Sequence, residues 1–128
     1  MNEAYGPMAD LDTTLAELRT AVASFVADRD WGQFHSPNNL SQAIAIESAE
    51  LMEHFLWLTR EEAASVLEDD ARRAAVADEL ADVLIYALSL ANALDVDVSG
   101  AVMDKLQHNE RRFPVETWHG RARLDDGA

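Results

Sequence analysis

The 128-residue chain contains no cysteine, which excludes a disulfide framework and any thiolate metal site. Basic residues are also few: 10 Lys and Arg stand against 24 Asp and Glu, a formal net charge of −14 at pH 7. This composition argues against binding to a nucleic acid backbone or an anionic membrane surface, because both need a basic patch. Two explanations of the acidity stay open: a solvated negative surface, or a group of acids gathered around hard cations.

Long apolar segments are absent as well. The most apolar run, residues 83–94, contains Ser89 and Asn92. It is shorter than the roughly 20 residues that a membrane-spanning helix needs. The first ten residues lack the basic and apolar regions of a signal peptide. We therefore expect a cytoplasmic protein, and its hydrophobic fraction of 48% is ample for the core of one domain.

Apolar residues recur at helical spacing, and no segment alternates with the period of a strand. The pattern predicts helices at about residues 15–30, 39–58, 60–67, 70–94 and 99–113, the last ended by Pro114. Suitable caps precede them. These are Thr14 or its neighbours Asp12 and Thr13, Ser36 or Asn38, Thr59 with Glu62, Asp69 or Asp70, and Ser99.

The predicted fold is an all-α, four-helix-bundle-like domain over residues 11–114, with flexible ends at residues 1–10 and 115–128. The helix at 70–94 is apolar almost all round in its second half. Three partner helices of moderate amphipathicity cannot easily cover it. We therefore expect a homo-oligomer, either a dimer or a tetramer formed as a dimer of dimers.

Two pairs of acids do not fit a solvated helix face. Glu47 falls within the apolar stripe of the helix at 39–58, and Glu50 lies one turn further on its flank. Glu79 and Asp82 repeat the spacing on the apolar helix at 70–94. Residues three apart on a helix point the same way, so two antiparallel helices would bring four carboxylates together.

Four carboxylates in a partly apolar setting repel one another, and a divalent cation removes that penalty. Oxygen ligands favour Mg²⁺, with Mn²⁺ as a substitute. The alternative is surface charge, since one such pair is common on solvated helices. A di-iron bundle requires Glu-x-x-His on two helices, and that spacing occurs here at Glu116 and His119, beyond Pro114.

Candidate nucleotide contacts lie near these helices. Lys105, Asn109 and Arg112 share one face of the helix at 99–113, where they are either ordinary surface residues or donors to phosphate oxygens. Trp31, Trp57 and Tyr86 fit either packing or a stacking wall for a nucleobase. His35 and His54 are expected to be structural or solvent-facing, and no phosphate-binding glycine loop occurs.

These motifs resemble the all-α nucleoside triphosphate pyrophosphohydrolases of the MazG-like superfamily, and within it the dCTP pyrophosphatase type. The hallmark E-x-x-E, spacer, E-x-x-D reads here as Glu47-Ser-Ala-Glu50 and Glu79-Leu-Ala-Asp82. The similarity covers residues 15–114. Its specific stretches are RDWGQFHSPNNL, the segment 47–57 ending in FLW, DELADVLIYAL and KLQHNERRFP.

The resemblance implies hydrolysis of a (deoxy)nucleoside triphosphate to the monophosphate and pyrophosphate, for nucleotide-pool control. It implies Mg²⁺ on the four catalytic carboxylates, and substrate contacts from Trp31, Trp57, Tyr86, Lys105, Asn109 and Arg112. It also implies a site completed across subunits. Two departures are the shorter spacer after Trp57 and Val22, where the dCTP type has a histidine near the base.

By this reading, a metal-assisted water attacks a phosphoryl centre, with one of the four carboxylates or Glu53 orienting the water. dCTP or a related pyrimidine nucleotide is the favoured substrate. The alternatives are another nucleotide such as dUTP or one with a modified base, and a non-catalytic acidic interaction module.

Overall fold

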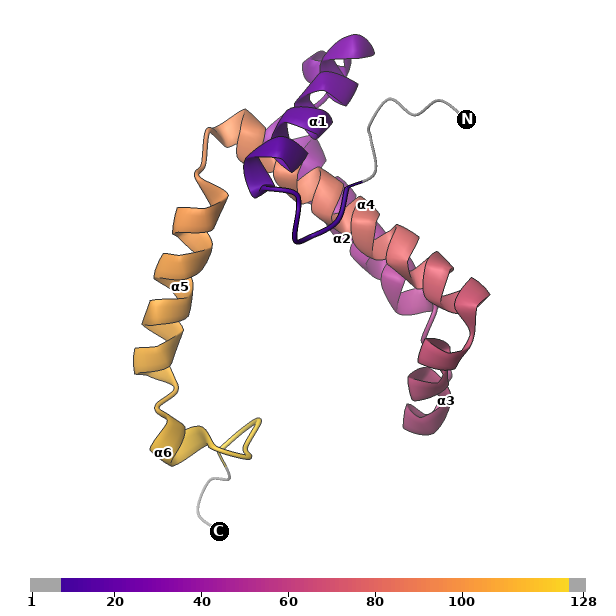
Figure 1. Cartoon of the computed structure of the whole chain (residues 1–128), viewed down its shortest axis with the longest axis vertical. Coiled ribbons are helices and arrows are strands. Elements are labelled where there is room, and N and C mark those ends of the chain that lie inside the picture. Colours follow the sequence, from indigo (N-terminus) through magenta and orange to yellow (C-terminus); the bar gives the residue numbers. More distant parts are fainter. Residues whose placement is uncertain (1–7, 125–128) are drawn as a thin grey trace. The chain divides into compact units, whose positions relative to one another are not determined.

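The computed structural model describes residues 8–124, and the regular elements within them are all helices, as Figure 1 shows. The elements, with the short 3₁₀ helices labelled η, are α1 (Leu15–Asp28), η1 (Trp31–Gln33), α2 (Pro37–Glu53), α3 (Arg60–Ala64), η2 (Ser65–Glu68), α4 (Asp70–Leu94), α5 (Val98–Arg112) and α6 (Val115–Trp118). The predicted all-α class is confirmed for this part of the chain. The outer parts of the two predicted flexible ends, residues 1–7 and 125–128, lie outside the described residues.

The described helices divide into two units. One unit ends at Asp95 and contains α1 to α4, and the other starts at Val96 and contains α5 and α6. The one-turn helix α6 lies within the segment predicted to be a flexible tail, where the sequence pattern had indicated no element. The domain boundaries at residues 11 and 114 stay a prediction.

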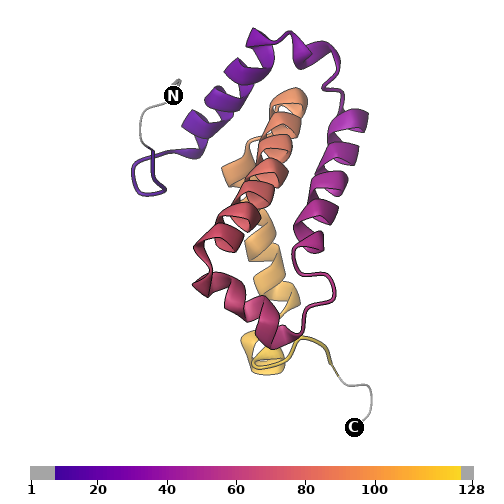
Figure 2. The same ribbon diagram turned by 90° about the vertical axis from the view of Figure 1, so that its right-hand side faces the viewer.

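In the first unit, α2 and α4 lie side by side and α1 packs against α4, as the two ribbon views show (Figures 1 and 2). The paired helices are antiparallel, since His35 before α2 contacts Ser89 late in α4, whereas Glu50 late in α2 approaches Glu79 early in α4. The buried apolar residues of the described chain are Leu40, Val66, Leu88 and Ala91. This antiparallel arrangement sets the two acidic pairs against each other.

Side-chain caps define where the helices begin. Thr14 and Thr59 each form a capping box with the glutamate three residues later, and Ser36 caps α2, which begins at a proline. Asp69 accepts from the backbone N–H of Arg72 at the start of α4. α5 is capped by Asp97 and not by Ser99 as predicted, because the helix begins one residue before that serine.

Helix α2 is shorter than predicted, because it ends at Glu53 and not at residue 58. The backbone N–H groups of residues 54–56 donate to carbonyls three residues back, which tightens the last turn. Trp57 then adopts a left-handed conformation with φ of 64°, which is incompatible with a right-handed α-helix. Phe55 and Leu58 therefore leave the helical stripe to which their spacing assigned them. α3 likewise ends at Ala64 and passes into η2.

Much of α4 is not covered within one chain. Leu80, Leu84 and Ile85 keep between 43% and 53% of their surface exposed. An apolar groove of about 380 Å³ runs between α1 and α4. It is lined by Leu18, Ala21, Val22, Phe25, Ala81, Leu84, Ile85 and Leu88. Among the described residues no helix is long and apolar enough to span a membrane.

Candidate active site

The two acidic pairs meet between α2 and α4. Glu47 and Glu50 from α2 and Glu79 from α4 each place one carboxylate oxygen within 4.8 Å of the others. The first and third are half-buried, whereas Glu50 is exposed. We call these three residues the carboxylate cluster. Asp82, the fourth predicted ligand, is half-buried one turn beyond Glu79, and its charge acts on Glu47.

The cluster has raised the pKa of Glu47. A hydrogen bond with Glu50 is the largest cause, followed by burial and then by the negative charges of Glu50, Asp82 and Glu79. Together these bring the pKa of Glu47 to about 7, from an ordinary value of 4.5. A carboxyl group placed among other carboxylates holds its proton because a further negative charge there is unfavourable.

The residues present fit a hard divalent cation. One oxygen of Glu47 and one of Glu79 are buried and have no hydrogen-bond partner in the described structure. Buried carboxylate oxygens without donors are costly unless a cation satisfies them. The atoms of the cluster that could coordinate a metal are all oxygens, the ligand type of Mg²⁺ and Mn²⁺. Three of the four predicted acids, Glu47, Glu50 and Glu79, therefore form a group that could hold a metal ion.

Metal affinity should rise with pH up to about 7. Glu47 must lose its proton to act as a ligand, and its pKa of about 7 means that protons compete with the metal below that value. Calorimetric titration with Mn²⁺ should show affinity falling by up to about tenfold per pH unit below neutrality and levelling off above it.

The stability of the metal-free protein should change with pH in the opposite direction to the metal affinity. Because the folded-state pKa is raised, its stabilising effect is complete below the unfolded value of 4.5 and is lost as pH rises through about 7.

A metal affinity that stays constant across this pH range would contradict the role given to Glu47. The matched control is Glu47→Gln, which should bind Mn²⁺ more weakly and with less dependence on pH, since the amide does not titrate.

A polar hollow of about 520 Å³ opens beside the cluster, lined by Glu50, Glu53, His54 and Glu79. His54 Nε2 lies 3.9 Å from Glu79 Oε1, so a protonated imidazole would form an ion pair there. Sequence reasoning gave His54 no place in the site. The signal was present, because His54 follows Glu50 by four residues and therefore shares its helix face.

Trp31 and Tyr86 are brought near each other through His35. The imidazole of His35 lies 6.3 Å from the Trp31 ring and 6.4 Å from the Tyr86 ring, measured between centroids. Trp31 also makes an edge-on contact with Phe25 at 5.7 Å. Trp57, in contrast, is 91% exposed. The structure thus groups two of the three predicted aromatic contacts.

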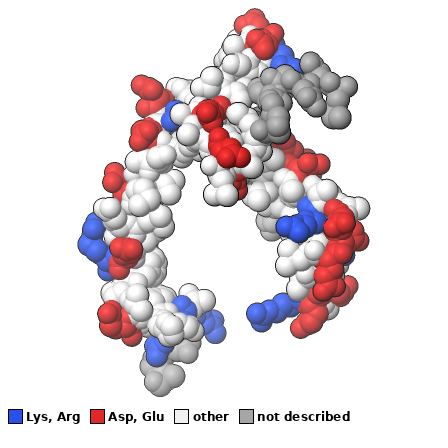
Figure 3. Space-filling view, in the orientation of Figure 1, with Lys and Arg blue, Asp and Glu red and all other residues white. Residues whose placement is uncertain are grey.

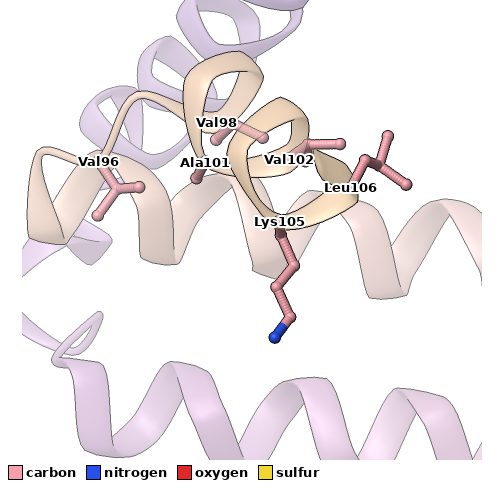
Figure 4. Close-up of a pocket in the computed structure, with 6 residues that line it drawn as sticks. All are labelled: Val96, Val98, Ala101, Val102, Lys105 and Leu106. Carbon is pink, nitrogen blue, oxygen red and sulfur yellow. The ribbon is translucent and has the colours of Figure 1, made fainter. Parts of the chain in front are cut away.

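Lys105, Asn109 and Arg112 belong to the second unit. Lys105 lines a mostly apolar hollow of about 340 Å³ on α5, together with Val96, Val98, Ala101, Val102 and Leu106 (Figure 4). Arg112 lies over the ring of Phe113, 5.1 Å from its centroid, and that ring stacks edge-on against Trp118. This part of the predicted substrate site is therefore built on α5, where the exposed side chain of Lys105 extends away from the helix (Figure 4).

Most of the remaining acids form a solvated surface. Figure 3 shows Asp and Glu spread over the molecule, with a dense group around α3. The exposed acids of that region are Glu61, Glu62, Glu68, Asp69 and Asp70. The net charge thus combines a general surface excess with the partly buried carboxylate cluster, which could hold a metal ion.

Comparison with known proteins identifies the family. The model of the MazG-like family matches residues 42–123, a segment that contains the carboxylate cluster, Asp82 and the three polar residues of α5. The chain belongs to the MazG-like family. This confirms the resemblance inferred from the two acidic motifs.

Named relatives of this MazG-like protein are pyrophosphatases. It is 42% identical to dCTP pyrophosphatase 1 of Bos taurus over 120 residues, which cover 93% of this chain and 71% of the relative. It is 43% identical to dCTP pyrophosphatase 1 of Homo sapiens over 104 residues, covering 81% and 61%. A pyrophosphatase crystal structure from Archaeoglobus fulgidus is 36% identical, with a TM-score of 0.72 over 86% of this chain and 97% of that one. The predicted enzyme class agrees with all three.

Proposed function

We propose that this protein hydrolyses a (deoxy)nucleoside triphosphate to the monophosphate and pyrophosphate, with dCTP or a related pyrimidine nucleotide as the favoured substrate. The carboxylate cluster carries the proposal, because it groups three acids that could hold a metal ion in a chain whose curated relatives are dCTP pyrophosphatases. The biological role would be control or cleaning of the nucleotide pool in the cytoplasm.

Each predicted site residue has a task under this proposal. Glu47, Glu50, Glu79 and Asp82 would hold Mg²⁺, or Mn²⁺ in its place. The bound metal would neutralise phosphate charge and acidify a water molecule. One of these carboxylates, or Glu53 at the rim of the hollow, would orient that water and accept its proton.

The other residues would bind the nucleotide. Trp31 and Tyr86 offer aromatic faces for the base, and the exposed indole of Trp57 offers a third. Lys105, Asn109 and Arg112 share one face of α5 and would donate to phosphate or sugar oxygens. Val22 lines an apolar groove and offers no hydrogen bond to a base, which favours testing dUTP and modified pyrimidines beside dCTP.

A panel of canonical and modified nucleoside triphosphates tests the function. With Mg²⁺ present, chromatography should show a monophosphate and pyrophosphate from dCTP or a related pyrimidine, and chelation by EDTA should stop the reaction. Release of orthophosphate with a diphosphate would refute cleavage between the α and β phosphates.

The alternative is a non-catalytic acidic interaction module. Calorimetry distinguishes the enzyme from the interaction module, because a module without a metal site should not bind Mn²⁺ stoichiometrically. Stoichiometric Mn²⁺ binding together with turnover supports the enzyme, and the absence of both supports the module.

We also propose that the protein is a dimer or a tetramer. The apolar groove between α1 and α4 and the half-exposed leucines of α4 would be covered by a second copy. Light scattering on the purified protein gives the mass, and a monomer at micromolar concentration would refute the proposal.

A further inference from the structure

A buried serine in α4 bonds to the connection between α1 and α2. Ser89 is 6% exposed and lies among the most buried residues of the first unit, beside Leu88. Its Oγ is 3.0 Å from Nδ1 of His35. A hydroxyl in such a position needs a hydrogen-bond partner, and here the partner comes from a segment 54 residues earlier in the chain.

The connection itself is held mainly by local hydrogen bonds. Backbone N–H groups of Phe34 and His35 donate to the carbonyl of Trp31, and the side chain of Asn39 donates to the carbonyl of Phe34. These bonds give the segment a fixed shape, and Figure 2 shows it as the turn between α1 and α2. They do not tie it to α4. The bond from His35 to Ser89 does.

The hydrogen bond between Ser89 and His35 lies on the same face of α4 as residues of the candidate active site. Asp82, Tyr86 and Ser89 are spaced by four and three residues, so they share one face of the helix. An imidazole fixed on Ser89 is therefore fixed beside Tyr86, at 6.4 Å between ring centroids, and the Trp31 ring lies 6.3 Å away on the same imidazole.

We propose that Ser89 is a positioning residue: its buried hydroxyl orients the His35 imidazole, which in turn holds Trp31 near Tyr86 at the nucleotide site. The inference rests on the proposed function for its effect on turnover, but the arrangement of the rings can be tested without it. Ser89 itself does not contact the nucleotide.

Kinetics of two single variants and their double variant form the first test. Ser89→Ala removes the hydroxyl, and His35→Phe keeps a ring but removes the nitrogen. Each should raise KM for the best substrate about three- to tenfold and leave kcat within about twofold, since binding geometry and not the metal centre is disturbed. The double variant should be no worse than either single variant, because both remove the same bond.

Ser48→Ala is the matched control. Ser48 is also a helical serine, but its hydroxyl donates to the carbonyl of Ile44 in its own helix, and within residues 8–124 it forms no hydrogen bond to another element. This variant should keep the wild-type KM. The Mn²⁺ affinity of Ser89→Ala should also equal that of the wild type.

Fluorescence provides a readout that does not depend on activity. The sequence has three tryptophans, so Trp57→Phe with Trp118→Phe leaves Trp31 as the single reporter. In that background Ser89→Ala should increase acrylamide quenching of Trp31, because the ring is no longer held. The inference would be overturned if Ser89→Ala changed neither the quenching of Trp31 nor KM. It would also be overturned if Ser89→Ala lowered kcat and weakened Mn²⁺ binding by similar factors. If no nucleotide is hydrolysed by the wild type, the proposed function fails, and the quenching result still decides the role of Ser89.

Discussion

Replacing Glu50 by glutamine is expected to lower kcat by about a thousandfold or more, an increase of about 4 kcal/mol in the activation barrier. Glu50 supplies one of the three carboxylate oxygens that lie within 4.8 Å of one another, and an amide neither carries the charge nor matches the donor strength that the cation needs. Asp82→Asn should have an effect of the same kind. Product formation measured by chromatography gives kcat, and calorimetry gives the accompanying loss of Mn²⁺ affinity.

The fold should survive this substitution. Glu50 is exposed, and its hydrogen bond and charge contribute to the raised pKa of Glu47, so removing the charge relieves repulsion in the metal-free protein. Circular dichroism and light scattering should therefore match the wild type. Glu61→Gln makes the same chemical change at an exposed position on α3 and should keep full activity. Full activity in purified Glu50→Gln would defeat the assignment of the site.

The second large effect is expected on stability. Leu40 is 1% exposed and is the one large side chain fully buried among the described residues. Leu40→Ala should reduce the free energy of unfolding by about 2–5 kcal/mol, since it removes apolar contacts and leaves a cavity. That is a large part of the roughly 5–15 kcal/mol that stabilises a typical domain. Urea denaturation at a fixed protein concentration measures it.

Leu11→Ala is the matched control for Leu40→Ala. The same methyl groups are deleted at a side chain that is fully exposed, so the urea midpoint should stay within error of the wild type. A loss smaller than about 1 kcal/mol in Leu40→Ala would mean that the interior of the first unit lies elsewhere.

Local sequence patterns were sufficient for most of the secondary structure. Capping boxes at Thr14 and Thr59, the serine before Pro37 and the aspartate before α4 act within one turn, so they can be recognised from a few consecutive residues. The end of α2 could not be recognised in this way. Its apolar spacing continues to Leu58. After Glu53, however, the backbone hydrogen bonds span three residues instead of four, and Trp57 adopts a left-handed conformation.

The acidic motifs illustrate the same division at the site. The sequence by itself determined that Glu47 and Glu50, and likewise Glu79 and Asp82, point the same way on their helices, because the helix period alone fixes that relation. Packing of α2 against α4 decided that three of these carboxylates meet within 4.8 Å and that Glu47 has a pKa of about 7. Both results depend on the distance between helices, which no local pattern encodes.

Histidines show most clearly what only the tertiary structure decided. In the sequence, His35 and His54 lie within segments typical of the family, but nothing in their spacing names the groups they contact. In the fold, His54 faces Glu79 at 3.9 Å, and His35 bonds to Ser89 across 54 residues of chain. The sequence determined most of the helices and their caps, and the family, since these follow from short-range spacing. The tertiary structure decided which polar groups become partners, because a buried donor or acceptor is satisfied by whatever group packing brings within about 3 Å.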